Sequence, residues 1–158
     1  MSALRFFMLL SLVVWLGGII FFAFVVAPAL FSILPTRHLA GLVVTRSLGA
    51  LHWMGITSGI VFAATSLAYS RVTVGRAHAF SAKHVLIYLM LLLTIISQFG
   101  ITPRMHALRT SMGEIDAVPP DNPARMQFNA LHVWSTRLEG GVFLMGLIVL
   151  FLTARQLT

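Results

Sequence analysis

Four long apolar segments, joined by short polar ones, dominate the pattern of hydrophobic and polar positions along the chain. A helix needs about 20 mostly apolar residues to cross a bilayer, and each segment reaches that length, the last of them only when Glu139 is included. We therefore expect a single four-span transmembrane domain over residues 1–158, with spans at about 4–34, 46–70, 81–102 and 132–155. The predicted fold class is all-α, an integral membrane four-helix bundle with antiparallel neighbours and both termini on the same side.

Helix start and stop signals mark the ends of these segments. Pro28 is an expected kink within the first span. The third helix is expected to run to about Thr102, before Pro103, because proline disturbs the helical hydrogen-bond pattern. The first part of the polar segment that follows is a candidate for a projecting helical continuation. N-cap candidates precede the other helices at Thr36, Ser81 and Asn122, the last of them followed by Pro123.

The composition favours an integral membrane protein. Of the 158 residues, 58% are hydrophobic and 9% are charged, whereas soluble domains carry about 25% charged residues. The net charge of +7 comes from basic residues spread over helix ends and loops, where such residues contact lipid headgroups. We therefore expect no nucleic-acid partner. Cysteine is absent, which excludes disulfides and thiolate metal sites.

Orientation rests on a small asymmetry of Lys and Arg. The two membrane sides carry similar numbers, but the second loop is short and basic, with Arg71 and Arg76 followed by Lys83. Because cytoplasmic loops are rich in Lys and Arg, we place both termini in the cytoplasm and expect the bacterial inner membrane. The expected partners are the lipid bilayer and either another membrane protein or a second copy of the chain.

Glu139 is the most informative polar residue. A span of about 20 residues that ends near Arg155 has to begin around Trp134, which draws Glu139 into the membrane. An ionisable group in the hydrocarbon costs roughly 2.5 kcal/mol or more and marks a functional site by default. Glu139 continues a stripe at helical spacing, made up of Arg125, Asn129, His132, Thr136 and Glu139. This stripe is expected to face the bundle or a water-filled cavity.

Antiparallel packing places the starts of the second and fourth helices and the end of the third on one membrane side. We expect His52 and Gln98 to lie nearest Glu139. The candidate cofactor-binding residues on that side are His52, Gln98, His132 and Glu139. The candidate metal ligands are His52, His106, His132, Met54 and Met105. No tight ligand motif is present, so these predictions rest on convergence of the helices.

Three interpretations of these groups remain. In the first, His52 and His132 are interfacial residues, and Glu139 is a buried acid that desolvation keeps neutral. In the second, two histidines from different helices bind haem b or a metal ion, since imidazole suits haem iron, copper and zinc. In the third, Met and His side chains such as Met54, Met105 and His106 are soft ligands for Cu(I) in transport.

Two strings in the first span carry a resemblance. With WLGG from Trp15 to Gly18 and APALF from Ala27 to Phe31, the chain resembles the membrane family related to human transmembrane protein 205, which implies a multipass membrane protein. More distantly, it resembles copper-resistance protein D and the HemJ-type protoporphyrinogen oxidases, which implies copper or haem b. Lys83 and His84 are loosely comparable to the His and Lys of the HemJ type, but the first span has no histidine where that pattern places one.

The predicted function is that of a multipass membrane protein with a polar His/Glu site between helices near one membrane face, able to hold haem b or a metal ion. The alternatives are a non-catalytic scaffold or accessory subunit, or transport of copper or a small solute. No nucleophile–base pair, phosphate-binding loop or paired carboxylates occur. An enzyme acting alone is therefore the least favoured class, and no catalytic residue is predicted.

Overall fold

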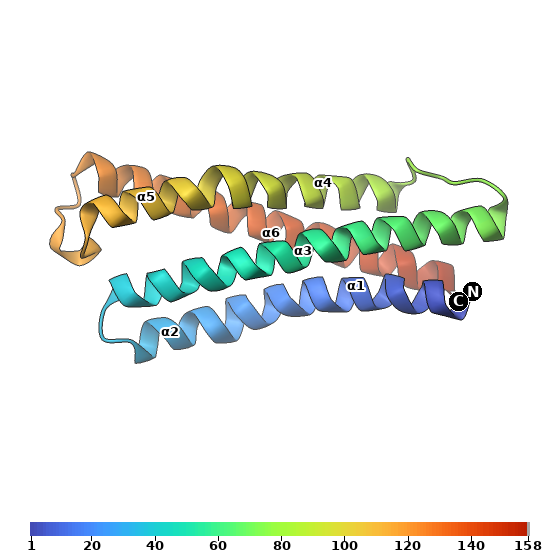
Figure 1. Ribbon diagram of the computed structural model, residues 1–158, viewed down its shortest axis with the longest axis horizontal. Helices are drawn as coiled ribbons and strands as arrows, with labels where there is room; N and C mark the ends of the chain where they lie inside the picture. Colours follow the sequence, from blue (N-terminus) through green and yellow to red (C-terminus); the bar gives the residue numbers. More distant parts are fainter. Residues whose placement is uncertain (158) are drawn as a thin grey trace.

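Four helical rods make up the protein. The computed structural model describes residues 1–157, and Figure 1 shows the rods lying lengthwise beside one another. The first rod comprises α1 (Ser2–Phe21), η1 (Phe22–Val26) and α2 (Ala27–Ile33), and the second is α3 (Arg37–Val74). The third comprises α4 (Ala82–Ile96), η2 (Ser97–Ile101) and α5 (Thr102–Met112). A short 3-10 turn, η3 (Ile115–Ala117), precedes the fourth rod, α6 (Pro123–Leu157).

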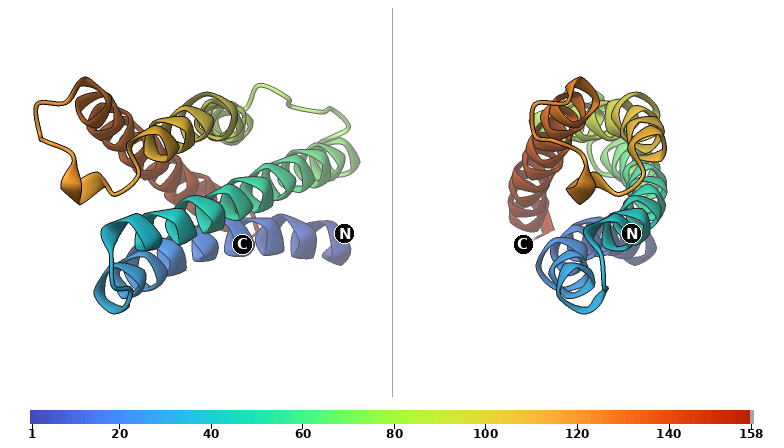
Figure 2. Two further views of the ribbon diagram at one scale, coloured as in Figure 1. Left: turned by 60° about the vertical axis from the view of Figure 1, so that its left-hand side comes forward. Right: turned by 90° about the vertical axis from the view of Figure 1, so that its left-hand side faces the viewer.

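Each rod is long and apolar enough to span a bilayer, so the chain is a multipass membrane protein. α1 packs against α3, α3 against α4, and α6 against both α4 and α5. Consecutive rods run antiparallel, and the two termini lie at the same end (Figure 1). The end-on view in Figure 2 shows the rods grouped around a common axis. The predicted all-α four-helix fold is confirmed.

A π-turn accompanies each of the two prolines inside a rod. In η1 and η2, the backbone N–H of the residue before the proline bonds the carbonyl five residues back. Proline has no N–H, and its ring clashes with the carbonyl four residues back in an α-helix; the wider π-turn accommodates both effects. The third rod therefore continues through Pro103 to Met112. The segment after Thr102 is thus the helical continuation that the sequence left open.

The helix ends follow local side-chain chemistry. The Thr36 hydroxyl accepts a hydrogen bond from the N–H of Leu39 at 3.2 Å, and Asn122 caps α6 through a 2.9 Å bond from the N–H of Ala124. Ser81 occupies the N-cap position of α4 without capping it by its side chain. α3 runs to Val74, beyond the expected end near Ser70, and stops where Gly75 adopts a positive φ of 73°.

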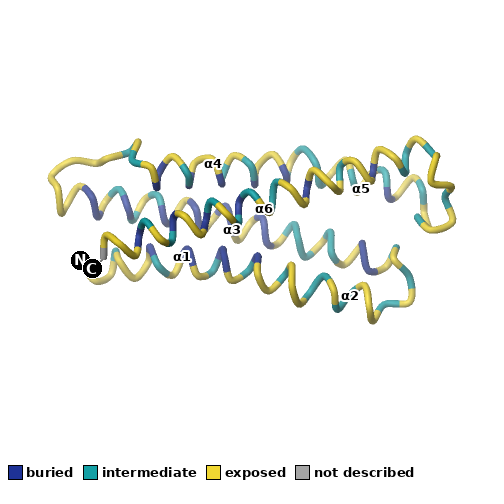
Figure 3. Tube along the Cα trace, turned by 180° about the vertical axis from the view of Figure 1, so that it is seen from behind, coloured by how far each residue is buried: buried dark blue, intermediate teal, exposed yellow. Residues whose placement is uncertain are grey.

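Buried residues recur along each rod between exposed ones (Figure 3), and many of the exposed residues are large and apolar. The largest of the fully buried side chains is Trp15 of α1. It lies against Gly55 and Gly59 of α3, where an added Cβ would be 2.5 Å from Nε1 and 2.8 Å from Cζ3 of the indole. Small residues at a spacing of four allow such close approach in membranes. This contact fixes α1 on α3, one turn from His52.

Candidate functional site

The buried side chain of His52 lies between two polar groups from neighbouring rods. Its Nδ1 is 2.9 Å from Oε1 of Gln98 in η2, and its Nε2 is 3.4 Å from Oε2 of Glu139 on α6. The second distance is within ion-pair range, without the alignment of a hydrogen bond. Glu139 thus points into the bundle. The structure brings together three of the four predicted cofactor-binding residues.

Local backbone geometry positions this Gln98–His52–Glu139 cluster. His52 belongs to the buried face of α3, together with Leu51, Gly55 and Ile56, and this face packs toward α1 and α4. Gln98 lies within the π-turn η2, and such turns are frequent at functional sites because they alter which side chains face inward. The cluster therefore depends on the helix distortion beside Pro103.

The cluster can hold a proton without a net charge. The amide oxygen of Gln98 accepts from Nδ1–H of His52, which leaves Nε2 facing the carboxyl group of Glu139. Nε2 can accept a proton from a neutral Glu139 acid, or the imidazolium can stand beside the carboxylate. Both arrangements contain the same number of protons and are neutral as a pair. Chains of Asp, Glu and His side chains form the proton relays of membrane pumps and transporters.

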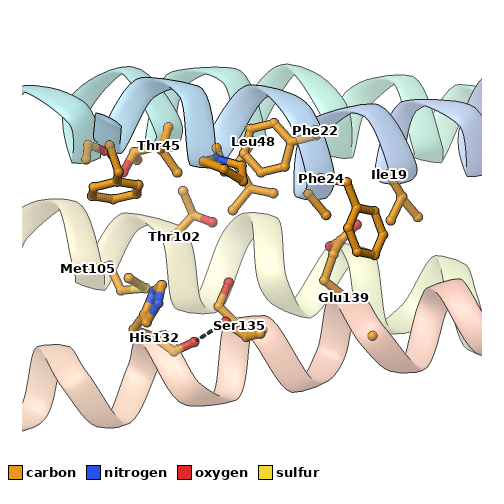
Figure 4. Close-up of a pocket in the computed structure, with 18 of the residues that line it drawn as sticks. Ile19, Phe22, Phe24, Thr45, Leu48, Thr102, Met105, His132, Ser135 and Glu139 are labelled. Carbon is orange, nitrogen blue, oxygen red and sulfur yellow. Dashed lines mark hydrogen bonds between the residues drawn. The ribbon is translucent and has the colours of Figure 1, made fainter. Parts of the chain in front are cut away.

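A cavity of about 550 Å³ adjoins the cluster on the Glu139 side. It lies between η1–α2 and the first half of α6, with α3 and α5 completing its wall. Figure 4 shows His132, Ser135 and Glu139 directed from α6 into this space. Its aromatic wall consists of Phe22, Phe24, Phe31 and Phe143. Phe24 is also 73% exposed at the outer surface, so this wall is in contact with lipid.

Arg109 of α5 forms the polar end of the cavity. Its side chain is only 7% exposed, and its guanidinium lies over the ring of Phe128 at 5.1 Å. Nη1 donates to the Thr45 hydroxyl at 3.4 Å, while Nε is buried without a hydrogen-bond partner. A Cβ at Gly41 would overlap the guanidinium. Among residues 1–157, Arg109 contacts no acidic side chain.

The other predicted ligands are dispersed. His132 and Met105 line the same cavity, from α6 and α5 (Figure 4), and His132 stacks on Phe128 with 6.5 Å between ring centroids. His106 is exposed. Met54 lies in a separate groove between α1 and α3. No group of three or more His, Asp or Glu side chains within residues 1–157 could hold a metal ion.

Further buried polar groups lie nearer the termini. Lys83 donates to Oε1 of Gln156 at 2.6 Å, and Nδ1 of His84 is 2.7 Å from the Ser81 hydroxyl. These two residues, which carry the loose resemblance to the HemJ type, precede Gln98 on the same rod by 14 to 15 residues, about 21 Å at the rise of an α-helix. They are therefore not part of the Gln98–His52–Glu139 cluster.

Sequence reasoning missed Arg109, Thr45 and the aromatic wall of the cavity. Arg109 follows the third span, where a basic residue ordinarily indicates a headgroup contact. A signal was available, because Gln98, Thr102, Met105 and Arg109 follow one another at spacings of 4, 3 and 4, which places them on one helical face. The stripe crosses Pro103, a residue that usually interrupts a helix, and this makes the signal easy to overlook.

A family model described as a domain of unknown function (DUF4149) matches residues 10–114. The matched region contains His52, Gln98 and Arg109 and ends before α6, which supplies Glu139 and His132. No curated protein and no solved structure matches the chain. The resemblances to transmembrane protein 205, to copper-resistance protein D and to the HemJ type stay predictions.

Proposed function

We propose that this chain, which belongs to the DUF4149 family of domains of unknown function, binds a small lipophilic molecule within the membrane. We propose further that binding of this molecule is coupled to binding of a proton. The ligand would occupy the 550 Å³ cavity, and the proton would be held between His52 and Glu139. The observation that carries the proposal is that Glu139 faces both the cavity and the buried ring of His52.

The cavity has the character of a ligand site. Small-molecule sites are typically concave, about 300–1,000 Å³ in volume and mostly apolar, with a few convergent polar groups. Here the aromatic side chains of η1, α2 and α6 supply the apolar lining, and Glu139, His132 and Arg109 supply the polar groups. The exposure of Phe24 and Phe31 on the lipid side supports entry from the bilayer.

Coupling to a proton follows from electrostatics. When the shared proton is lost, Glu139 carries a negative charge that is no longer neutralised by His52. Displacing water from the cavity with an apolar ligand would then remove the remaining solvation of that charge, which is costly in a low-dielectric environment. Ligand binding and retention of the proton should therefore favour each other, and binding should be stronger at lower pH.

Filling the cavity should prevent binding. An added Cβ at Gly140 meets no atom within 4 Å, and Gly140 lines the cavity, so we expect Gly140→Leu to occupy ligand space without disturbing the fold. The measurement uses the protein in phosphatidylcholine nanodiscs and, as probe, a monoacylglycerol that bears a diazirine in its chain. Photolabelling of α6 should be about tenfold lower in Gly140→Leu than in the unmodified protein.

Gly17→Leu is the matched control, because Gly17 is an equally open helical position outside the cavity. Equal labelling of the two variants and the unmodified protein would contradict the proposal. The proton coupling has its own readout: labelling should be stronger at pH 5.5 than at pH 8, and Glu139→Gln should abolish the difference. His132→Asn, which removes the imidazole that lines the cavity, should retain it.

A second candidate function, binding of haem b or copper, is favoured by one observation, namely that Met105 and His132 line the same cavity. Nδ1 of His52 bonds Gln98, and its Nε2 faces Glu139 at 3.4 Å and not the cavity, so His132 would be the imidazole ligand on the cavity wall. If this function holds, protein supplied with haem or Cu(I) should acquire a haem absorption band or a stoichiometric metal content, and His132→Asn should lose it. A colourless, metal-free preparation would rule it out.

The role of a scaffold or accessory subunit also stays a prediction. The outward faces of the rods carry many exposed apolar side chains, which suit lipid and a partner helix equally. A second protein, or a second copy of the chain, that co-purifies in fixed stoichiometry from mild detergent would favour this role. If this partner no longer co-purifies with the Glu139→Gln variant, the contact between the two chains lies near the His52–Glu139 pair.

A further inference from the structure

Arg109 is a buried cation whose counter-charge is missing from the described chain. A basic residue near a helix end usually extends its charged group to the headgroup region, whereas Arg109 is 7% exposed and folds back over Phe128. Its guanidinium has five N–H donors. One of these bonds Thr45, whose own hydroxyl donates to the carbonyl of Gly41 at 2.7 Å, and Nε has no partner.

Burying a charge without a partner is unfavourable, so buried charges are paired or bind a ligand. The acid among the cavity-lining residues, Glu139, is already matched by His52. Phe128 precedes Glu139 by 11 residues, which places Arg109 about 16 Å from Glu139 along the bundle. The guanidinium of Arg109 is therefore an unneutralised positive charge at one end of the cavity, and the aromatic wall extends from there toward Glu139.

From this geometry we infer that the cavity binds an amphiphilic anion, with an oxyanion head on Arg109 and an apolar chain along the aromatic wall toward Glu139. The planar guanidinium binds carboxylate and phosphate oxygens in a two-pronged geometry that lysine cannot reproduce. Gly41 leaves the space that the guanidinium needs, since any side chain there would overlap it. The inference deepens the proposed function and rests on it for the cavity being a ligand site.

Two sources could supply the same chemistry, a single-chain carboxylate and a diacyl lipid with a phosphate head. Both present an oxyanion beside apolar chain, and both reach the cavity from the bilayer through the side lined by Phe24 and Phe31. The two differ in the number of chains. A single chain is directed along the aromatic wall, while a diacyl lipid leaves its second chain outside in the membrane.

The test uses the full-length protein in phosphatidylcholine nanodiscs at pH 8 with three diazirine probes of equal chain length: a fatty acid, the corresponding neutral monoacylglycerol and a diacyl phosphatidate. We expect the fatty acid, the phosphatidate or both to label the α5 and α6 peptides about tenfold or more above the neutral probe. Whichever anion labels more strongly identifies the source. Equal labelling by all three probes would overturn the inference.

Arg109→Gln should reduce labelling by the preferred anion to the level of the neutral probe and leave the neutral probe unchanged. Arg109→Lys, which keeps the charge and loses the planar fork, should give an intermediate value. Arg104→Gln is the matched control, because Arg104 is an exposed arginine on the same helix outside the cavity, and it should label like the unmodified protein. If Arg109→Gln does not fold, the preference of the unmodified protein for anionic over neutral probes still decides.

Failure of this inference can be distinguished from failure of the proposed function. If the neutral probe labels the cavity and Gly140→Leu prevents it, the cavity is a ligand site; absence of any preference for an anion then removes only the role given to Arg109. If Gly140→Leu leaves labelling by every probe unchanged, the cavity does not bind ligands, and both proposals fall.

Discussion

Trp15→Ala is expected to lower the free energy of unfolding by about 3 kcal/mol. Truncating a buried aromatic side chain costs about 3–5 kcal/mol in soluble proteins, partly through transfer out of water and partly through the cavity left behind. Lipid tails are as apolar as the protein core, so in a membrane the transfer part is small. The lower end of the range is therefore appropriate. Equilibrium unfolding in mixed micelles, followed by circular dichroism of the helices, measures the change.

The other two tryptophans supply matched controls. Trp15 is 1% exposed, while Trp53 and Trp134 are 54% and 55% exposed on the lipid-facing surface. Their rings contact exposed neighbours, Phe99 and Arg137. We expect Trp53→Ala and Trp134→Ala to cost less than about 1 kcal/mol each. Three equal effects would mean that Trp15 does not fix α1 against the glycines of α3.

The general fold could be predicted because a bilayer simplifies the problem. Backbone groups must be satisfied within each segment, so a long apolar run has to be a helix, and short loops make neighbouring helices antiparallel. Helix caps such as Thr36 and Asn122 could be predicted because they depend only on hydrogen bonds to neighbouring residues in the sequence. The way the third rod passes Pro103 was harder to predict, because proline usually interrupts a helix and the π-turn that accommodates it here is uncommon.

The approach of His52 and Gln98 to Glu139 was predictable for a similar reason. Once the topology is fixed, depth in the membrane follows from position along each helix at 1.5 Å per residue. Sequence could not show which further residues would line an internal space, because a cavity results from the way in which large side chains fail to fill the bundle. Of the two candidate histidines His52 and His132, it is His52 that lies within ion-pair distance of Glu139 in the described part of the chain.

The site proposed for the oxyanion at Arg109 and the site proposed for the proton at His52 and Glu139 lie along the same helices. Thr45 precedes His52 by seven residues on α3, and His132 precedes Glu139 by seven on α6, so both pairs are separated by two helical turns. The Arg109–Thr45 end and the His52–Glu139 end therefore lie on the same inward faces of the same rods. A ligand lying along these faces would sense both the fixed charge of Arg109 and the proton held by His52 and Glu139.

His52→Leu is expected to lower the free energy of unfolding by about 3 kcal/mol. Removing one partner of a buried pair costs about 3–5 kcal/mol, since the other is left uncompensated. The low end applies because Glu139 borders the cavity and can take up a proton instead of remaining charged. His132→Leu is the control: this imidazole is exposed and its ring makes a stacking contact only, so its loss should cost less than about 1 kcal/mol. Similar values for the two variants would contradict a buried pair.

Adding Glu139→Leu to His52→Leu should restore most of the lost stability, because two apolar side chains replace a pair whose desolvation offsets much of its mutual attraction. Glu139→Leu alone should be tolerated better than His52→Leu alone, since a neutral imidazole keeps its bond to Gln98. In a double-mutant cycle, the two substitutions should therefore be strongly non-additive. The double variant should also bind the neutral diazirine probe equally at pH 5.5 and pH 8. A stable double variant that retained the pH dependence would show that the proton is held elsewhere.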